Sequence, residues 1–308
     1  MAIKKPEQMD FSKKKFTMII SGSPGLGKTT LALSAPNPIL FDLDKGISRI
    51  KAEHRCIASE AETYEEMLDD MQSDAYKAAE SVVVDTGGSL VQLMQPWAKK
   101  QEPKAARDGR AMFGVIKREF DRLTWQIRND GKNLVIVFHT TEVPKGDVVT
   151  MRLSCEGSAK DIVWTPADIG GYMFMQGGKR MIGFTPTEEY FAKGCFGING
   201  LWEIPELKSG TRNTFLADLF DRARESIVQE SKVFSEQKMT YDTVMMCGRE
   251  LISGIDSPEK ATETAQAIAQ NEHALTSKDE LRQLMANRIK ELGYVWDKAA
   301  KRYVENNA

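Results

Sequence analysis

The sequence is poor in the residues that build disulfide frameworks and zinc sites. It has four cysteines and three histidines among 308 residues, and no cysteine stands in a Cys-x-x-Cys pair. This scatter argues against a disulfide-rich fold and against a zinc site. It favours reduced thiols, as expected of a protein that resides in the cytoplasm.

Long apolar runs and a strong charge of either sign are also missing. No stretch of about 18 apolar residues suggests a membrane span, and the first residues lack the apolar core of a signal peptide. The net charge is −2, so affinity for nucleic acid has to come from local basic clusters. The content of 41% hydrophobic and 28% charged residues is typical of a globular protein with one large core and an appendage.

The most specific feature present is a glycine-rich loop at residues 22–29. These residues are Gly-Ser-Pro-Gly-Leu-Gly-Lys-Thr, which completes the phosphate-loop pattern G-x-x-x-x-G-K-[ST]. A strand-like run precedes the loop and a helix-like segment follows it, as the motif requires. The loop predicts a site for ATP in which Lys28 reaches the β- and γ-phosphates and Thr29 binds Mg²⁺. The predicted nucleotide contacts are Gly22, Ser23, Pro24, Gly25, Leu26, Gly27, Lys28, Thr29 and Thr30.

Strand-like and helix-like segments alternate over residues 16–140. Strands buried on both faces are expected at 16–21, 38–43, 81–85 and 133–138, and helices at 62–79, 88–96 and 112–129. Repeated β-α-β units with a phosphate loop predict a doubly wound, mainly parallel α/β sheet of the P-loop NTPase type. Residues 172–184 predict an antiparallel hairpin that extends this sheet.

The two ends of the chain differ from this α/β region, which we expect to span residues 16–220. Residues 1–15 contain five lysines and predict a mobile basic arm. Residues 221–308 are poor in glycine and predict a helical module that ends in an aromatic hairpin. The hairpin aromatics Tyr294, Trp296 and Tyr303 either form a small local core or stack on bases.

Polar side chains end three of the predicted strands. Asp85 ends an apolar strand in the Walker B manner, so we expect it to hold Mg²⁺ beside Thr29. Asp44 follows the second strand and is the candidate base that activates water, with Asp42 as the alternative and a turn-capping role as the simpler one. His139 ends the fourth strand, where it either contacts the γ-phosphate or makes an ordinary strand-end hydrogen bond.

With these motifs the chain resembles the RecA-like recombination ATPases, above all the short phage RecA-like group linked to single-strand annealing. The resemblance covers about residues 16–200 and rests on 22–29, 41–46, 82–86, 135–140 and 184–197. It implies a RecA-like fold, Mg²⁺-dependent and DNA-stimulated ATP hydrolysis, Asp44 as the catalytic carboxylate, and His139 or Thr140 as the nucleotide sensor. RecA itself has glutamate and glutamine in these two roles.

The same resemblance implies partners and a location. A ring or filament of identical subunits is expected, in which Lys193 acts on the γ-phosphate of a neighbouring subunit. Single-stranded DNA is the expected substrate, and a single-strand DNA-binding protein is a possible partner for residues 221–308. A phage-encoded protein of this group acts in the cytoplasm of its bacterial host.

Two segments are candidate DNA contacts. The first, residues 97–112, has an alternative as a solvated surface loop, and the second, residues 142–164, is long enough to be either functional or disordered. Residues 97–112 are basic and include an aromatic, which suits phosphate neutralisation and base stacking. Residues 142–164 are nearly neutral and qualify by their position after the sensor strand. The candidate contacts are Trp97, Lys99, Lys100, Lys104, Arg107, Arg110, Lys145 and Arg152.

Two other functions fit the same residues. A P-loop kinase for a small molecule needs a basic lid near the γ-phosphate, and residues 99–110 are the candidate lid. A nucleotide-gated interaction protein with little turnover would instead load a partner through residues 221–308.

Overall fold

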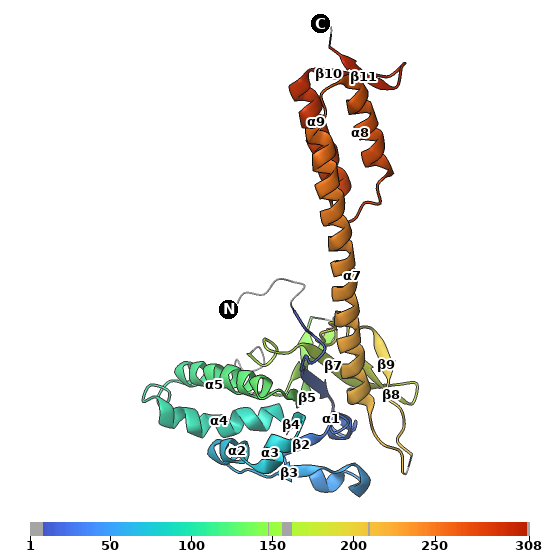
Figure 1. Ribbon diagram of the computed structural model, residues 1–308. Coiled ribbons are helices and arrows are strands. Elements are labelled where there is room, and N and C mark those ends of the chain that lie inside the picture. Colours follow the sequence, from blue (N-terminus) through green and yellow to red (C-terminus); the bar gives the residue numbers. More distant parts are fainter. Residues whose placement is uncertain (1–8, 147, 156–161, 209, 307–308) are drawn as a thin grey trace. The chain divides into compact units, whose positions relative to one another are not determined.

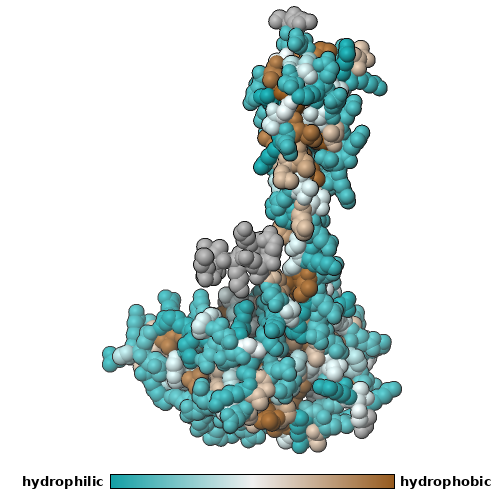
Figure 2. Space-filling model, viewed as in Figure 1, coloured by the Kyte–Doolittle hydropathy of each residue, from teal (hydrophilic) through white to brown (hydrophobic). Residues whose placement is uncertain are grey.

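The computed structural model describes residues 9–146, 148–155, 162–208 and 210–306. They divide into two compact units, one of Phe11–Ser226 and one that begins at Ile227. Lys4 and Lys5 of the predicted basic arm lie outside the described residues, whereas Lys14 forms an ion pair with Asp168. No helix in the described ranges is long and apolar enough to cross a membrane. The visible surface of each unit is mainly hydrophilic with scattered apolar side chains (Figure 2).

Nine strands of the described chain form one sheet in the first unit, in the order β3-β2-β4-β5-β1-β7-β8-β9, with β6 paired to β5. The strands from β3 to β7 in this order are parallel, and β6, β8 and β9 pair antiparallel. The bounds are β1 (Thr17–Gly22), β2 (Pro38–Asp42), β3 (Ile57–Ser59), β4 (Ser81–Asp85), β5 (Asn133–Lys145), β6 (Val148–Leu153), β7 (Ile169–Gln176), β8 (Lys179–Gly183) and β9 (Leu201–Glu203). The predicted mainly parallel sheet with a hairpin extension is confirmed.

Helices cover both faces of this sheet (Figure 1). One face carries α2 (Tyr64–Asp70), α3 (Asp74–Ala78), α4 (Gly87–Gln101) and α5 (Gly109–Asn129), and the other carries α1 (Lys28–Ala32) and the first turns of α7 (Phe215–Ser253). The helix expected over 62–79 is two helices, because the Ser73 side chain accepts a hydrogen bond from the Tyr76 N–H and starts a new one.

Alternate residues of each central strand enter different cores. Ile19, Val84 and Phe138 pack with the helices α2 to α5. Their neighbours Ile20 and Val83 point to the opposite face and are fully buried as well. Burial on both faces explains why these strands are continuous apolar runs in the sequence.

The second unit is a small helical bundle. It contains the rest of α7, together with α8 (Pro258–Gln270), α9 (Ser277–Leu292) and a hairpin of β10 (Tyr294–Asp297) and β11 (Arg302–Glu305). Tyr294 and Tyr303 pack against its core, while Trp296 meets Tyr303 edge to face and stays 47% exposed. The predicted helical appendage with a terminal hairpin is confirmed, and two of its three aromatics serve the local core.

Candidate nucleotide site

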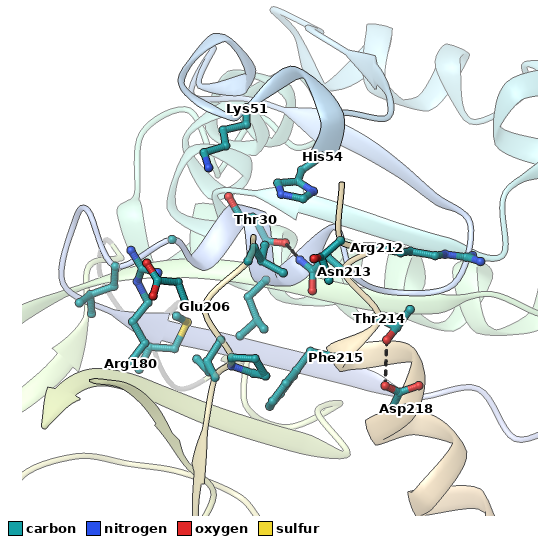
Figure 3. Close-up of a pocket in the computed structure, with 18 of the residues that line it drawn as sticks. Thr30, Lys51, His54, Arg180, Glu206, Arg212, Asn213, Thr214, Phe215 and Asp218 are labelled. Carbon is teal, nitrogen blue, oxygen red and sulfur yellow. Dashed lines mark hydrogen bonds between the residues drawn. The ribbon is translucent and has the colours of Figure 1, made fainter. Parts of the chain in front are cut away.

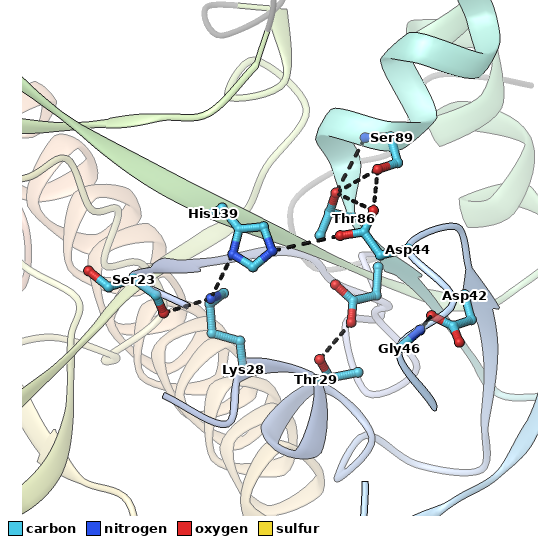
Figure 4. Close-up of polar contacts among 10 residues, drawn as sticks. Ser23, Lys28, Thr29, Asp42, Asp44, Gly46, Thr86, Ser89 and His139 are labelled. Atoms are coloured by element: carbon cyan, nitrogen blue, oxygen red, sulfur yellow. Dashed lines mark hydrogen bonds and ion pairs between the residues drawn. The ribbon is translucent and has the colours of Figure 1, made fainter. Parts of the chain in front are cut away.

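Strand register brings the predicted catalytic residues to one edge of the sheet. Gly22 at the end of β1 is paired with His139 in β5. Asp85 at the end of β4 is paired with Asp42 in β2. Because all four strands run parallel, their carboxyl ends meet at the edge where ligands bind in such sheets (Figure 4).

The phosphate loop leaves β1 through glycines whose conformations other residues avoid. Gly27 has φ 85° and caps the start of α1. Gly22 lies so close to β7 that a Cβ atom would sit 2.5 Å from the Met173 carbonyl oxygen. The loop therefore has the tight turn that a phosphate cradle requires.

The side chain of Lys28 is buried and folds back over its own loop. Its Nζ donates a hydrogen bond to the Ser23 carbonyl at 2.9 Å and lies 3.2 Å from Nδ1 of His139. Burial lowers the pKa of Lys28, and the nearby charge of Asp85 opposes that shift. Residues 23–25 of the loop are exposed.

His139 links the loop lysine to the candidate base. An ammonium group can only donate, so Nδ1 of His139 accepts from Lys28 and the ring proton is assigned to Nε2. That nitrogen faces Oδ2 of Asp44 at 3.7 Å. The three side chains form a row from the phosphate loop to the carboxylate (Figure 4).

Thr29 and Asp85 lie together as a metal site requires. The Thr29 hydroxyl donates to Oδ2 of Asp85 at 2.6 Å, and burial raises the pKa of Asp85. A hydroxyl and a carboxylate are the oxygen ligands that Mg²⁺ takes beside a phosphate group. The donor set therefore fits Mg²⁺.

Asp44 and Asp42 lie two residues apart, but their carboxylates have different hydrogen-bond partners. Both carboxylate oxygens of the buried Asp42 accept backbone N–H bonds, from Gly46 at 2.8 Å and from Ile47 at 2.7 Å. Asp42 is thus the turn-capping aspartate, and its oxygens are already occupied.

Asp44 is partly exposed at the sheet edge and accepts from the hydroxyls of Thr86 and Ser89. The imidazole of His139 nearby and the hydroxyls of Ser89 and Thr86 hold the pKa of Asp44 below its usual range. Asp44 therefore stays a carboxylate at neutral pH, as a base must.

A pocket of about 440 Å³ begins at the phosphate loop, with Gly27 and Thr30 on its wall (Figure 3). This volume lies within the range of small-molecule sites. The sequence-based reasoning missed its polar lining, which includes Arg49, Lys51, His54, Arg180, Arg212 and Asn213. Arg49 and His54 belong to two short 3₁₀ turns that follow Asp44, and Lys51 lies between these turns. Their position in the sequence shortly after Asp44 was the signal that could have found them.

Lys193 lies away from these residues. It is paired with Gly170 near the start of β7, and its Nζ donates to the Ala167 carbonyl. The start of β7 is opposite the carboxyl end that carries the phosphate loop. Its expected action on a neighbouring subunit stays a prediction.

The basic segment 97–112 is not the single loop that the sequence suggested. Residues up to Gln101 belong to α4 and those from Gly109 to α5, because Ala98, Ala105 and Met112 are buried and anchor the segment to the core. Trp97 packs edge to face against Tyr64 at 5.3 Å, which corrects its expected role as an open stacking surface. All five cations are exposed. Lys100 pairs with Glu65, whereas Lys99, Lys104, Arg107 and Arg110 form no ion pair with a described residue.

The segment 142–164 begins as a hairpin and not as a loop. Strand β5 continues past His139 to Lys145, where β6 returns antiparallel beside it. Continuation of the ladder hydrogen bonds satisfies the backbone that a loop would leave open. Arg152 projects from β6 and is exposed.

Comparison with known proteins gives matches of two kinds, a family and solved structures. A family described as AAA domain matches residues 14–196. Among solved structures, a KaiC-like protein from the hyperthermophilic archaeon Pyrococcus horikoshii OT3 is similar with a TM-score of 0.37 and 14% identity, over 62% of this chain and 90% of that chain. No curated protein matches the sequence.

Proposed function

The chain belongs to the AAA domain family, and from this premise we propose that it binds ATP with Mg²⁺, hydrolyses it, and couples hydrolysis to single-stranded DNA. The observation that carries the proposal is the row of contacts from Lys28 through His139 to Asp44. It joins a phosphate-binding group to a carboxylate base through a residue on the strand that leads into the β5–β6 hairpin.

ATP would lie with its phosphates in the loop and its nucleoside in the pocket beside Thr30. Lys28 has to release at least one of its two partners to reach both the β- and γ-phosphates, because its three N–H donors cannot hold four acceptors. We expect it to release His139 and to keep the carbonyl of Ser23 in its own loop. Thr29 and Asp85 would hold Mg²⁺, which neutralises phosphate charge when bound. Asp44 would take the proton of the attacking water.

Release of His139 by Lys28 would change the surroundings of a residue in β5. His139 loses its hydrogen-bond donor at Nδ1 when the lysine turns to phosphate, while its other nitrogen still faces Asp44. The residues after His139 continue as one strand into the hairpin. A change in the orientation of the imidazole can therefore shift the β5–β6 hairpin, where we place the DNA.

Action in recombination or strand annealing is the finer part of the proposal, and the resemblance to RecA-like proteins supports it. A ring or filament with Lys193 acting between subunits belongs to the same proposal, as does a partner for the unit that begins at Ile227. The kinase alternative loses support, because the buried side chain of Ala105 fixes the basic segment expected as its lid to the core.

The test is ATP hydrolysis by the full chain with Mg²⁺, with and without an oligo-dT strand. Stimulation by DNA supports the proposal. Phosphoryl transfer to a small acceptor identifies a kinase, and binding without turnover identifies a nucleotide-gated interaction protein. The Asp44→Asn variant is the control for contaminating ATPase.

A further inference from the structure

A second pocket lies beside β1 and β7, on the opposite side of β5 from Asp44, which follows β2, and Asp85, which ends β4. It is bounded by the end of β1, the β5–β6 hairpin and residues near 191, and its volume is about 270 Å³. Whole small-molecule ligands occupy about 300–1,000 Å³, so this pocket suits one flat fragment such as a nucleobase. Its chemically distinctive lining residues are Thr140, Arg152, Trp164, Tyr172 and Phe191.

An aromatic corner forms one wall of this pocket. Phe191 is 50% exposed, and its ring centroid lies 4.4 Å from that of Trp164 with the two planes at 63°. Trp164 occupies the space above Gly170, where a Cβ atom would come within 2.4 Å of the indole. The glycine therefore lets the indole lie against the sheet and fixes one side of the corner.

The backbone on both sides of Phe191 is fixed as well. The Glu189 carbonyl accepts from the Met151 N–H at 2.6 Å, and Lys193 exchanges two backbone hydrogen bonds with Gly170. Between them, the ring of Tyr190 stacks on Tyr172 at 4.4 Å. A half-exposed aromatic on a fixed backbone is a preorganised stacking surface, because little ordering entropy is lost when a ring lands on it.

The charges around the pocket favour a phosphate on one side only. Arg152 lines it, is exposed, and forms no ion pair with any described residue. The adjoining groove beyond Met151 and Tyr172 is lined by Glu142, Glu188 and Glu189, which repel phosphate groups. A nucleic-acid backbone that crosses the pocket therefore has to pass on the Arg152 side.

We propose that this pocket receives one unstacked base of single-stranded DNA, which stacks on Phe191 and meets Trp164 with its edge while Arg152 contacts an adjacent phosphate. The inference rests on the proposed function, which it makes specific by naming the residues that meet the DNA. Thr140 lines the pocket and directly follows His139. A base in the pocket thus touches the strand one residue away from the partner of Lys28.

The experiment compares binding of two labelled strands by fluorescence anisotropy, an oligo-dT and an abasic strand of equal length. The proteins are the full chain, Phe191→Ala, Phe191→Trp and the control Trp125→Ala, since Trp125 is 67% exposed on α5. Loss of one stacking surface raises the Kd for oligo-dT about 5- to 150-fold. The same Phe191→Ala change leaves the Kd for the abasic strand unaltered, Phe191→Trp retains tight binding, and Trp125→Ala changes neither Kd.

The outcomes separate this inference from the proposed function. If wild-type protein binds oligo-dT but Phe191→Ala weakens both strands equally or neither, the base pocket is wrong and DNA coupling stands. If wild-type protein binds neither strand, DNA coupling itself is wrong. If an oligo-rU of equal length binds more tightly than oligo-dT with the same dependence on Phe191, the occupant is RNA and the assignment to DNA is overturned. Thermal melting of each variant checks that the fold is intact.

Discussion

The sheet edge around Lys28 and the basic segment between α4 and α5 are both charged, but their charges are held in opposite ways. At the edge, Lys28 contacts His139, which faces Asp44, and Thr29 contacts Asp85. In the basic segment, Lys104 and Arg107 are exposed, and the described residues offer neither of them an ion-pair partner.

The difference shows what each region can do. Charges that contact one another in a partly buried site are fixed in direction and shift each other's pKa, which suits chemistry. Charges that extend separately into water are mobile and screened by salt, which suits at most a loose attraction for a polyanion. The predictions below test this contrast, and we expect their effects to decrease in the order given.

Replacement of Lys28 tests the first region most severely. We expect Lys28→Ala to lose measurable ATP binding and to lower hydrolysis by at least about 10²–10³-fold, the effect of removing one electrostatic donor from a transition state. Calorimetric titration with Mg²⁺ and ATP measures the binding. The control is Lys45→Ala, because Lys45 is exposed and its ion-pair partner within the described part of the chain is Glu62. Wild-type ATP affinity in Lys28→Ala would contradict the phosphate-loop assignment.

Asp44 and Asp42 form a matched pair within the same edge. Asp44→Asn should retain ATP affinity but lower the rate of hydrolysis by about 10²–10⁴-fold, because a positioned base is lost. Asp42→Asn removes a charged acceptor from two backbone N–H groups and should lower the free energy of unfolding by about 1.5–3 kcal/mol.

The readouts for this pair are steady-state turnover and urea unfolding. If Asp42→Asn stops hydrolysis in a fully stable protein while Asp44→Asn is active, the two assignments have to be exchanged.

The site could be predicted from the sequence where a motif coincides with the end of a buried strand. Asp85 and His139 each follow an unmistakable apolar run, and parallel register then brings them to the phosphate loop, although β5 continues beyond His139 to Lys145. The difference between Asp44 and Asp42 could not be predicted, because it depends on which carboxylate meets the N–H groups of the next turn. The partnership of Ser89 with Asp44 depends likewise on how α4 starts.

The prediction of an open loop at residues 97–112 was wrong, because amino-acid composition does not show which side chains pack into the core. Trp97 looks available in the sequence, but the helical turn that contains it places the indole against Tyr64 in the core. The aromatic corner of Phe191 and Trp164 had no motif at all. It arises from Gly170 and from backbone bonds between residues about 20 to 40 positions apart, which local patterns do not encode.

The pH dependence of Mg²⁺-ATP binding tests whether the carboxylates at the edge are tuned by their contacts. Burial raises the pKa of Asp85, whereas the nearby imidazole of His139 lowers the pKa of Asp44, so acidification protonates Asp85 first. Protonated Asp85 cannot hold the metal. Affinity should therefore begin to fall above the ordinary aspartate pKa of about 3.9, by about tenfold per pH unit below the pKa of Asp85.

The control for this profile is Asp85→Asn, which should bind weakly but without the same acid limb. Stability without ligand has the opposite sign for the two groups. The contribution of Asp85 is present in acid and is lost as the pH rises through its raised pKa, whereas that of Asp44 is lost as the pH falls through its lowered one. An acid limb that persists unchanged in Asp85→Asn would assign it to another group.

Replacement of the exposed cations of the basic segment should give the smallest effect. We expect that effect in the salt dependence of DNA affinity. Replacing Lys99, Lys104 and Arg107 with alanine should reduce the slope of log affinity for single-stranded DNA against log salt by about 0.7 for each phosphate that the protein no longer neutralises. Lys100→Ala should change it less, because the charge of Lys100 is already paired with Glu65. Lys77→Ala is the control for Lys100→Ala, since Lys77 on α3 is likewise exposed and paired, with Asp74. ATP affinity should be unaffected in all of these variants, because the replaced side chains do not line the nucleotide pocket.

An unchanged salt slope in the triple variant would show that DNA does not pass over this segment and would leave Arg152 as the phosphate contact. A triple variant that failed to bind ATP as well would instead show that the two regions are coupled, and the contrast between them would fail.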